Sequence, residues 1–116
     1  MQITQGDCGG IIFRNNLSDQ GYLALLCTHG TVGFKTYNPT NGTKTIQVDS
    51  MPQSENDITL AVVAKDDHFQ LFVNNQQALS IYDRTYSQGG NIGFLAFPLD
   101  TATEVAYKNV RVWTFA

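Results

Sequence analysis

The stretch GGIIFRNNLSDQGYLALLC, residues 9–27, decides the fold. Residues 9–14 and 22–27 are short runs rich in apolar, β-branched and aromatic side chains, and a polar segment that ends in Gly21 separates them. Two such runs around a polar connection with glycine predict a β-hairpin. Further outward, runs of the same kind recur at residues 31–37, 43–49, 58–64, 69–73, 78–82, 91–97, 104–107 and 110–115.

The spacing of these runs predicts an all-β fold. No segment has the helical period of about 3.6 residues, and turn residues such as Asn41 and Gly42 separate the runs. Many short strands with turns at this spacing are typical of an antiparallel β-sandwich. The apolar runs at residues 58–64 and 92–97 are expected to be buried strands at its centre. The 116 residues suit a single domain that covers residues 1–116.

Composition and charge narrow the choice of partners. Charged residues make up 15% of the chain, the formal net charge is −3, and Lys and Arg are scattered. This pattern argues against nucleic acid or an anionic membrane surface as a partner. No apolar run reaches the roughly 20 residues of a membrane helix, so direct membrane insertion is not expected. A surface solvated mainly by uncharged polar side chains favours an extracytoplasmic location, at the cell surface or secreted.

Six motifs, taken in order, resemble a known superfamily. They are GGIIFRN (9–15), GYLAL (21–25), NDITLAVVAKD (56–66), FQLFVNNQ (69–76), GGNIGFLA (89–96) and EVAYKNVRVW (104–113). Their order is similar to that of the concanavalin A-like lectin/glucanase (laminin-G-like) superfamily, specifically its 3-keto-disaccharide hydrolase-like branch. Similar domains occur as extracytoplasmic modules of bacterial receptor-type Ser/Thr kinases. The resemblance spans nearly the whole chain and implies a jelly-roll sandwich.

The chain departs from that superfamily at its start. Such domains begin with further strands upstream of the hairpin at residues 9–27, and here most of them are missing, so we expect a domain excised from a larger protein. The strand at residues 110–115, with Trp113, is then expected to present an unprotected sheet edge. Exposed edges recruit strands from a second chain, which predicts a homo-oligomer. The alternative is a monomer in which residues 1–5 cap this edge.

Catalysis is not expected from the acidic residues. Glycoside hydrolases need a pair of carboxylates at the sugar, and the glucanases of the resembled superfamily carry them on a Glu-x-Asp-x-x-Glu strand. This chain has only two glutamates, Glu55 and Glu104, which are far apart in the sequence, and it lacks that motif. We interpret both as solvated surface residues. The sequence therefore predicts a protein that is not an enzyme.

Metal and cofactor sites are not expected either. Asp66, Asp67 and His68 form either a ligand cluster or a polar hairpin turn, and the turn is favoured because Asp is a common turn residue. His29 is similarly interpreted as a corner residue before a glycine. The resemblance suggests loop aspartates as calcium ligands, but none of the candidates sits among other oxygen donors; they are Asp49, Asp83 and Asp100.

A ligand-binding site is predicted at four residues near the first hairpin. Arg14 ends an apolar strand, Tyr22 begins its partner, and Lys35 and Tyr37 alternate onto one face of the next strand. Tyrosine rings stack on the apolar faces of sugars, and Arg donates hydrogen bonds to hydroxyl groups. The alternative is an Arg in solvent beside tyrosines that cover the rim of the core.

The two cysteines are expected to be neighbours. Counting outward from the loop centre near Leu17 and Ser18 brings Cys8 and Cys27 opposite each other across the hairpin. They form either a disulfide, which needs an oxidising compartment, or two buried thiols.

The sequence favours a non-catalytic, extracytoplasmic module that binds or senses a ligand, most simply a carbohydrate. Two other functions stay open. One is a glycoside hydrolase-like enzyme domain that acts on disaccharides or 3-keto-disaccharides, and the other is a structural domain that binds proteins.

Overall fold

A computed structural model of the chain describes residues 1–50, 58–86, 88–99 and 101–107. Within these residues all regular structure is β-strand, and no helix is long and apolar enough to cross a membrane. In chain order the strands are β1 (Gln2–Gln5), β2 (Cys8–Asn15), β3 (Gly21–Cys27), β4 (Thr31–Asn38), β5 (Gly42–Ser50), β6 (Leu60–Lys65), β7 (His68–Val73), β8 (Gln76–Tyr82), β9 (Asn91–Phe97) and β10 (Glu104–Ala106).

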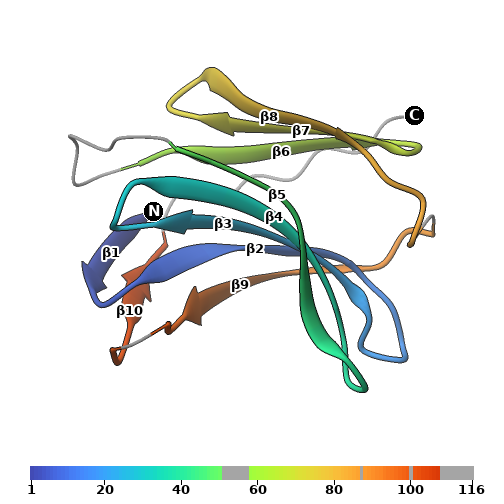
Figure 1. The fold of residues 1–116 in the computed structure, drawn as a ribbon, viewed down its shortest axis with the longest axis horizontal. Coiled ribbons are helices and arrows are strands. Elements are labelled where there is room, and N and C mark those ends of the chain that lie inside the picture. Colours follow the sequence, from blue (N-terminus) through green and yellow to red (C-terminus); the bar gives the residue numbers. More distant parts are fainter. Residues whose placement is uncertain (51–57, 87, 100, 108–116) are drawn as a thin grey trace.

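The strands form an antiparallel sandwich, which confirms the predicted fold class. A five-stranded sheet in the order β5-β4-β3-β2-β9 lies against a three-stranded sheet in the order β6-β7-β8 (Figure 1). β1 pairs with β10 at one end of the five-stranded sheet. The five-stranded sheet thus has one face toward the three-stranded sheet and one face turned away from it, which is called the outer face below.

The first hairpin has the register that was predicted by counting outward from the centre of its loop. β2 pairs with β3 from Cys8 opposite Cys27 to Phe13 opposite Tyr22. Asp19 completes the turn with a positive φ of 58°, and the side chain of Asn16 accepts hydrogen bonds from the backbone N–H groups of Ser18 and Gln20. Local side-chain hydrogen bonds of this kind stabilise a turn and fix the register on either side.

The core between the two sheets is built around a cluster of aromatic rings. Phe13, Tyr22 and Phe34 come from the five-stranded sheet, and Phe69 comes from the three-stranded sheet. Their ring centroids lie between 4.8 and 6.0 Å apart. Such aromatic pairs contribute about 0.5–1.5 kcal/mol each beyond the burial of their surface. This cluster holds the two sheets together at the level of the first hairpin.

Two expectations about burial are wrong. The run at residues 58–64 contributes to β6, which is an edge strand of the three-stranded sheet and is only partly buried. The run at residues 92–97 forms β9, which is an edge strand of the five-stranded sheet and not a central one. The side chains of Ile92 and Phe94 are about half exposed, with exposed fractions of 48% and 41%. The strand whose residues are all buried is β3, because it lies in the middle of the sheet.

Some expectations fall outside the described residues. These are the strand at residues 110–115 with Trp113, the side chain of Glu55 and that of Asp100. The self-association that depends on residues 110–115 stays a prediction. Residues 2–5 do form a strand, and its described partner is β10, with Ile3 opposite Val105.

Candidate ligand-binding groove

Tyr22 is a core residue, which corrects its predicted role as a surface platform for a ligand. Its side chain is completely buried. The Tyr22 hydroxyl donates to Oδ1 of Asp83 at 2.7 Å and accepts from the backbone N–H of Tyr86 at 3.0 Å. The ring is therefore held from both sheets and from the segment after β8, and it is not available to a ligand.

The contact between Tyr22 and Asp83 shifts the pKa values of both groups. Burial and the hydrogen bond to Asp83 raise the pKa of Tyr22 to about 12. Burial acts to raise the pKa of Asp83 as well, but the hydrogen bonds from Tyr22 and Thr85 outweigh it and hold that pKa below its usual value. Asp83 is thus an ionised acceptor inside the fold, and its Oδ1 accepts hydrogen bonds from the Tyr22 hydroxyl and the backbone N–H of Thr85.

Arg14 covers the edge of the aromatic cluster. It has a positive φ of 51° and lies where the register between β2 and β9 is irregular. Its guanidinium carbon is 4.8 Å from the centroid of the Phe69 ring, and its Nη1 donates to the backbone oxygen of Tyr86 at 3.3 Å. Arg14 therefore packs against the three-stranded sheet, which neither the predicted ligand site nor the alternative of an Arg in solvent anticipated.

Lys35 and Tyr37 lie on the outer face, as their alternation predicts. Their neighbours Phe34 and Thr36 are buried toward the three-stranded sheet, so Lys35 and Tyr37 point the other way. The Tyr37 hydroxyl donates to Oδ1 of Asn15. The structure thus divides the four predicted residues into two pairs on opposite faces, and they do not form one site.

A groove on the outer face brings Lys35 together with residues that the sequence did not single out. The groove has a volume of about 180 Å³. Its lining residues are Cys8, Leu25, Cys27, His29, Thr31, Gly33, Lys35, Val48, Phe97 and Leu99.

Strand pairing explains how this lining assembles. Cys8 lies opposite Cys27 on one side and opposite Phe97 on the other, and Gly33 lies opposite Val48. Residues that face each other across neighbouring strands point to the same side of a sheet. All five strands of this sheet, β2 to β5 and β9, therefore contribute side chains to one row across the outer face.

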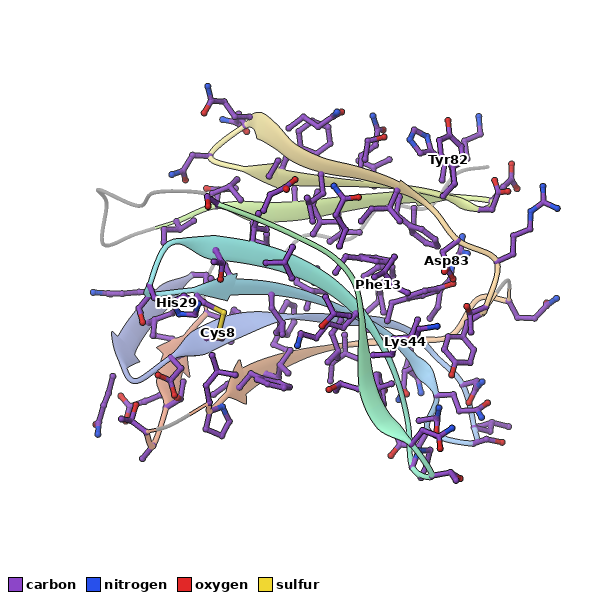
Figure 2. All side chains as sticks on the ribbon, in the orientation of Figure 1. Cys8, Phe13, His29, Lys44, Tyr82 and Asp83 are labelled. Carbon is purple, nitrogen blue, oxygen red and sulfur yellow. A yellow bond between two sulfur atoms is a disulfide. The ribbon has the colours of Figure 1, made fainter. Side chains whose placement is uncertain are left out.

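The disulfide Cys8–Cys27 forms part of the groove. The two sulfur atoms are bonded, and the Cα atoms are 4.1 Å apart. Of the two possibilities left open by the sequence, a disulfide or two thiols, the structure has the disulfide. The two cysteines lie opposite each other, as counting along the hairpin predicted. Figure 2 shows Cys8 and His29 at the same end of the five-stranded sheet, with Tyr82 and Asp83 at the opposite end beside the three-stranded sheet.

Gly33 leaves the middle of the groove open. A Cβ atom at this position would meet Cγ2 of Val48 at 3.5 Å as its nearest neighbour, which is an ordinary contact. The fold therefore has room for a methyl group here, and the space stays free because the residue is glycine.

Both polar and apolar groups border the groove. Val48 and Leu99 are about half exposed, with exposed fractions of 47% and 51%. His29 Nε2 lies 3.0 Å from the hydroxyl oxygen of Thr31, with which it shares a hydrogen bond. The groove thus offers a ligand an apolar surface beside hydrogen-bonding groups.

Asp66, Asp67 and His68 form a turn whose contacts are with other parts of the protein. Asp66 has a positive φ of 54° between β6 and β7, and Oδ2 of Asp67 lies 2.7 Å from Nε of Arg84. His68 stacks on Tyr82, with ring centroids 4.3 Å apart. Across the described part of the chain, no group of three or more His, Cys, Asp or Glu side chains could hold a metal ion.

The sequence could have indicated part of the groove. Gly33 and Lys35 share one face of an alternating strand, which places an open position beside a cation. Phe97, Val48 and Leu99 could not be added, because nothing in the sequence says that β9 and β5 flank the same sheet. His29 was interpreted as a corner residue, and it does occupy the turn between β3 and β4.

Comparison with known proteins identifies the fold. No protein-family model and no curated protein sequence matches the chain. The chain is similar to the solved structure of a carbohydrate-binding module, CBM66 from Bacillus subtilis, with a TM-score of 0.70 and 23% sequence identity. The match covers 80% of this chain and 60% of the other, so the chain spans less than two thirds of that structure. At this identity, the likeness shows that the two proteins share a β-sandwich fold.

Proposed function

We propose that this chain is a non-catalytic carbohydrate-binding module that works outside the cytoplasm as part of a larger protein. The observation that carries the proposal is the groove on the outer face of the five-stranded sheet. The shared fold with a carbohydrate-binding module supports it.

The chemistry of the groove suits a sugar. Phe97 and Leu99 present apolar surface, which fits the C–H face of a sugar ring. Lys35, His29 and Thr31 carry the groups that hydrogen-bond to hydroxyls. Sugars combine these two kinds of surface, and an apolar wall beside a few polar groups recognises both.

The size of the groove limits how much of a glycan it holds. Its volume of about 180 Å³ is below the roughly 300–1,000 Å³ of pockets for drug-sized ligands. The groove therefore suits one sugar unit of a longer chain. Because the lining stands on paired strands and a disulfide, it is formed before the ligand arrives, which lowers the entropic cost of binding.

The disulfide and the surface support the proposed location. Disulfides persist in oxidising compartments, and a chain with 15% charged residues carries a mostly uncharged polar surface. A sensing role, as in the modules of receptor-type kinases, and a preference for the disaccharides of the 3-keto-disaccharide hydrolase-like branch rest on the sequence resemblance alone.

The groove supports binding rather than hydrolysis. Two carboxylates at the sugar would be needed for a glycoside hydrolase. The described lining residues include neither Asp nor Glu, and Glu104 lies on β10 in the two-stranded sheet.

A glycan array with the whole chain tests the proposal, followed by calorimetry on the glycans it retains. Gly33→Ala places a methyl group in the groove, and Leu99→Ser removes half-exposed apolar surface from its wall. Both variants are expected to keep the circular dichroism spectrum and to bind at least severalfold more weakly. Tyr82→Ala is the matched control, because Tyr82 is 71% exposed on the other sheet. Equal binding by all three variants and the wild type would reject the groove as the site.

A further inference from the structure

Lys35 is held in the groove by an aromatic ring. β4 directs its side chain to the outer face, where Nζ lies 5.7 Å from the centroid of the Phe97 ring. A cation over a ring face is attracted by the ring but keeps its charge. In the described part of the chain, the structure records this ring contact for Lys35 and no ion pair with a carboxylate.

Hydrogen bonds engage two described acidic residues next to the groove. Asp7 precedes Cys8, and its Oδ2 accepts the backbone N–H groups of Leu99 at 2.7 Å and Thr101 at 3.0 Å. Asp49 follows Val48, so alternation turns it to the opposite face of the sheet, where it accepts from Nε2 of Gln47. Lys35 therefore brings a positive charge into the groove of a chain whose formal net charge is −3.

We infer that the sugar bound in this groove is acidic, with a carboxylate or a sulfate group that pairs with Lys35. The apolar face of its ring lies against Phe97 and Leu99, and the acidic group reaches the ammonium. A charge pair beside apolar walls is stronger than one in open water, because the local dielectric constant is lower. This inference rests on the proposed function and adds the class of ligand to it.

Matched pairs of oligosaccharides test the inference. One pair is oligogalacturonate and the same oligomer methyl-esterified on its carboxylates, and the other is a sulfated galactan oligomer and its unsulfated form. Calorimetry is expected to show about 10- to 100-fold tighter binding of the charged member of at least one pair. The pair with the larger difference identifies the group as carboxylate or sulfate. The advantage is expected to shrink as sodium chloride rises from about 0.01 to 1 M, because salt screens the charges.

Lysine variants connect the effect to the groove. Lys35→Met is expected to remove most of the charged member's advantage, so that the charged and neutral members bind with similar affinity. Lys35→Arg is expected to retain the advantage. Lys44→Met is the matched control, because it removes the same charge from an exposed residue outside the groove lining, at the other end of the sheet from Cys8 in Figure 2.

Two results separate this inference from the proposed function. If charged and neutral members bind equally, and Leu99→Ser weakens both, the inference is wrong and the carbohydrate groove stands. If glycans bind but neither Leu99→Ser nor Lys35→Met changes their affinity, both the inference and the assignment of the groove are wrong. Retention of only neutral glycans on the array would also overturn the inference.

Discussion

Replacing both cysteines with alanine is expected to destabilise the domain by about 3 kcal/mol. Cys8 and Cys27 are 19 residues apart in the sequence, and the chain-entropy treatment gives about 3 kcal/mol for closing a loop of this length in the unfolded state. For a domain of roughly this size the loss corresponds to a decrease in Tm of about 12 °C, at about 4 °C per kcal/mol. Alanine is chosen because both cysteines are buried and no hydroxyl group is then placed in the core.

Urea unfolding followed by circular dichroism measures this loss. The wild type with a reducing agent is expected to unfold at the same urea concentration as the double variant, and the reducing agent is expected to leave the variant unchanged. The slope of the transition shows whether both proteins expose the same surface on unfolding. A difference below about 1 kcal/mol would refute the entropic argument, and two titratable thiols in the denatured, non-reduced wild type would refute the bridge itself.

Three further predictions concern the core and catalysis. Tyr22→Phe removes the donor to Asp83 and the acceptor of the Tyr86 N–H, so urea unfolding is expected to show a loss of about 1–3 kcal/mol; an unchanged midpoint would show that the hydrogen bonds contribute nothing. Neutral Tyr22 stabilises the fold fully below its unfolded pKa of 10, and this contribution is expected to vanish as the pH rises to its folded pKa of about 12. Unfolding curves across this pH range measure the loss, together with ultraviolet titrations of the wild type and Tyr22→Phe; a folded Tyr22 that ionises at pH 10 would contradict it. No hydrolysis of laminarin is expected, and hydrolysis that survives Glu55→Gln with Glu104→Gln would reveal another catalytic set.

The first hairpin could be predicted because its information is local. The polar loop between two apolar runs defines the turn, and the turn defines which residues face each other. Cys8 and Cys27 were therefore predicted to lie opposite each other, and the pairing of β2 with β3 confirms this. Neither step required knowledge of the rest of the fold.

The orientation of Tyr22 could not be predicted, because β3 has no polar alternation. Leu23 and Leu25 on the outer face are as apolar as Tyr22, Ala24 and Leu26 on the inner face, and all are buried. A strand buried on both sides gives no sign of which side meets the core. β4 does alternate, and there the outward direction of Lys35 followed from the sequence.

The groove itself depends on strand order, which a single sequence does not contain. The whole three-stranded sheet lies between Val48 and Phe97 in the sequence, and these two residues reach one face only because β9 pairs with β2 and β5 pairs with β4. Arg14 shows a second limit. Its positive φ at an irregular register turned it toward the other sheet, and strand alternation alone does not predict such a position.

The central claim is that the groove beside the disulfide binds a sugar, and an NMR titration tests it most directly. Uniformly ¹⁵N-labelled protein is titrated with the glycan that the array retains best. The largest saturable shifts are expected on the groove amides, which are those of Thr31, Gly33, Lys35 and Leu99. The amides of His68 and Tyr82, on the other sheet, are expected to stay unchanged. Saturable shifts centred on His68 and Tyr82, with the groove amides unmoved, would contradict it.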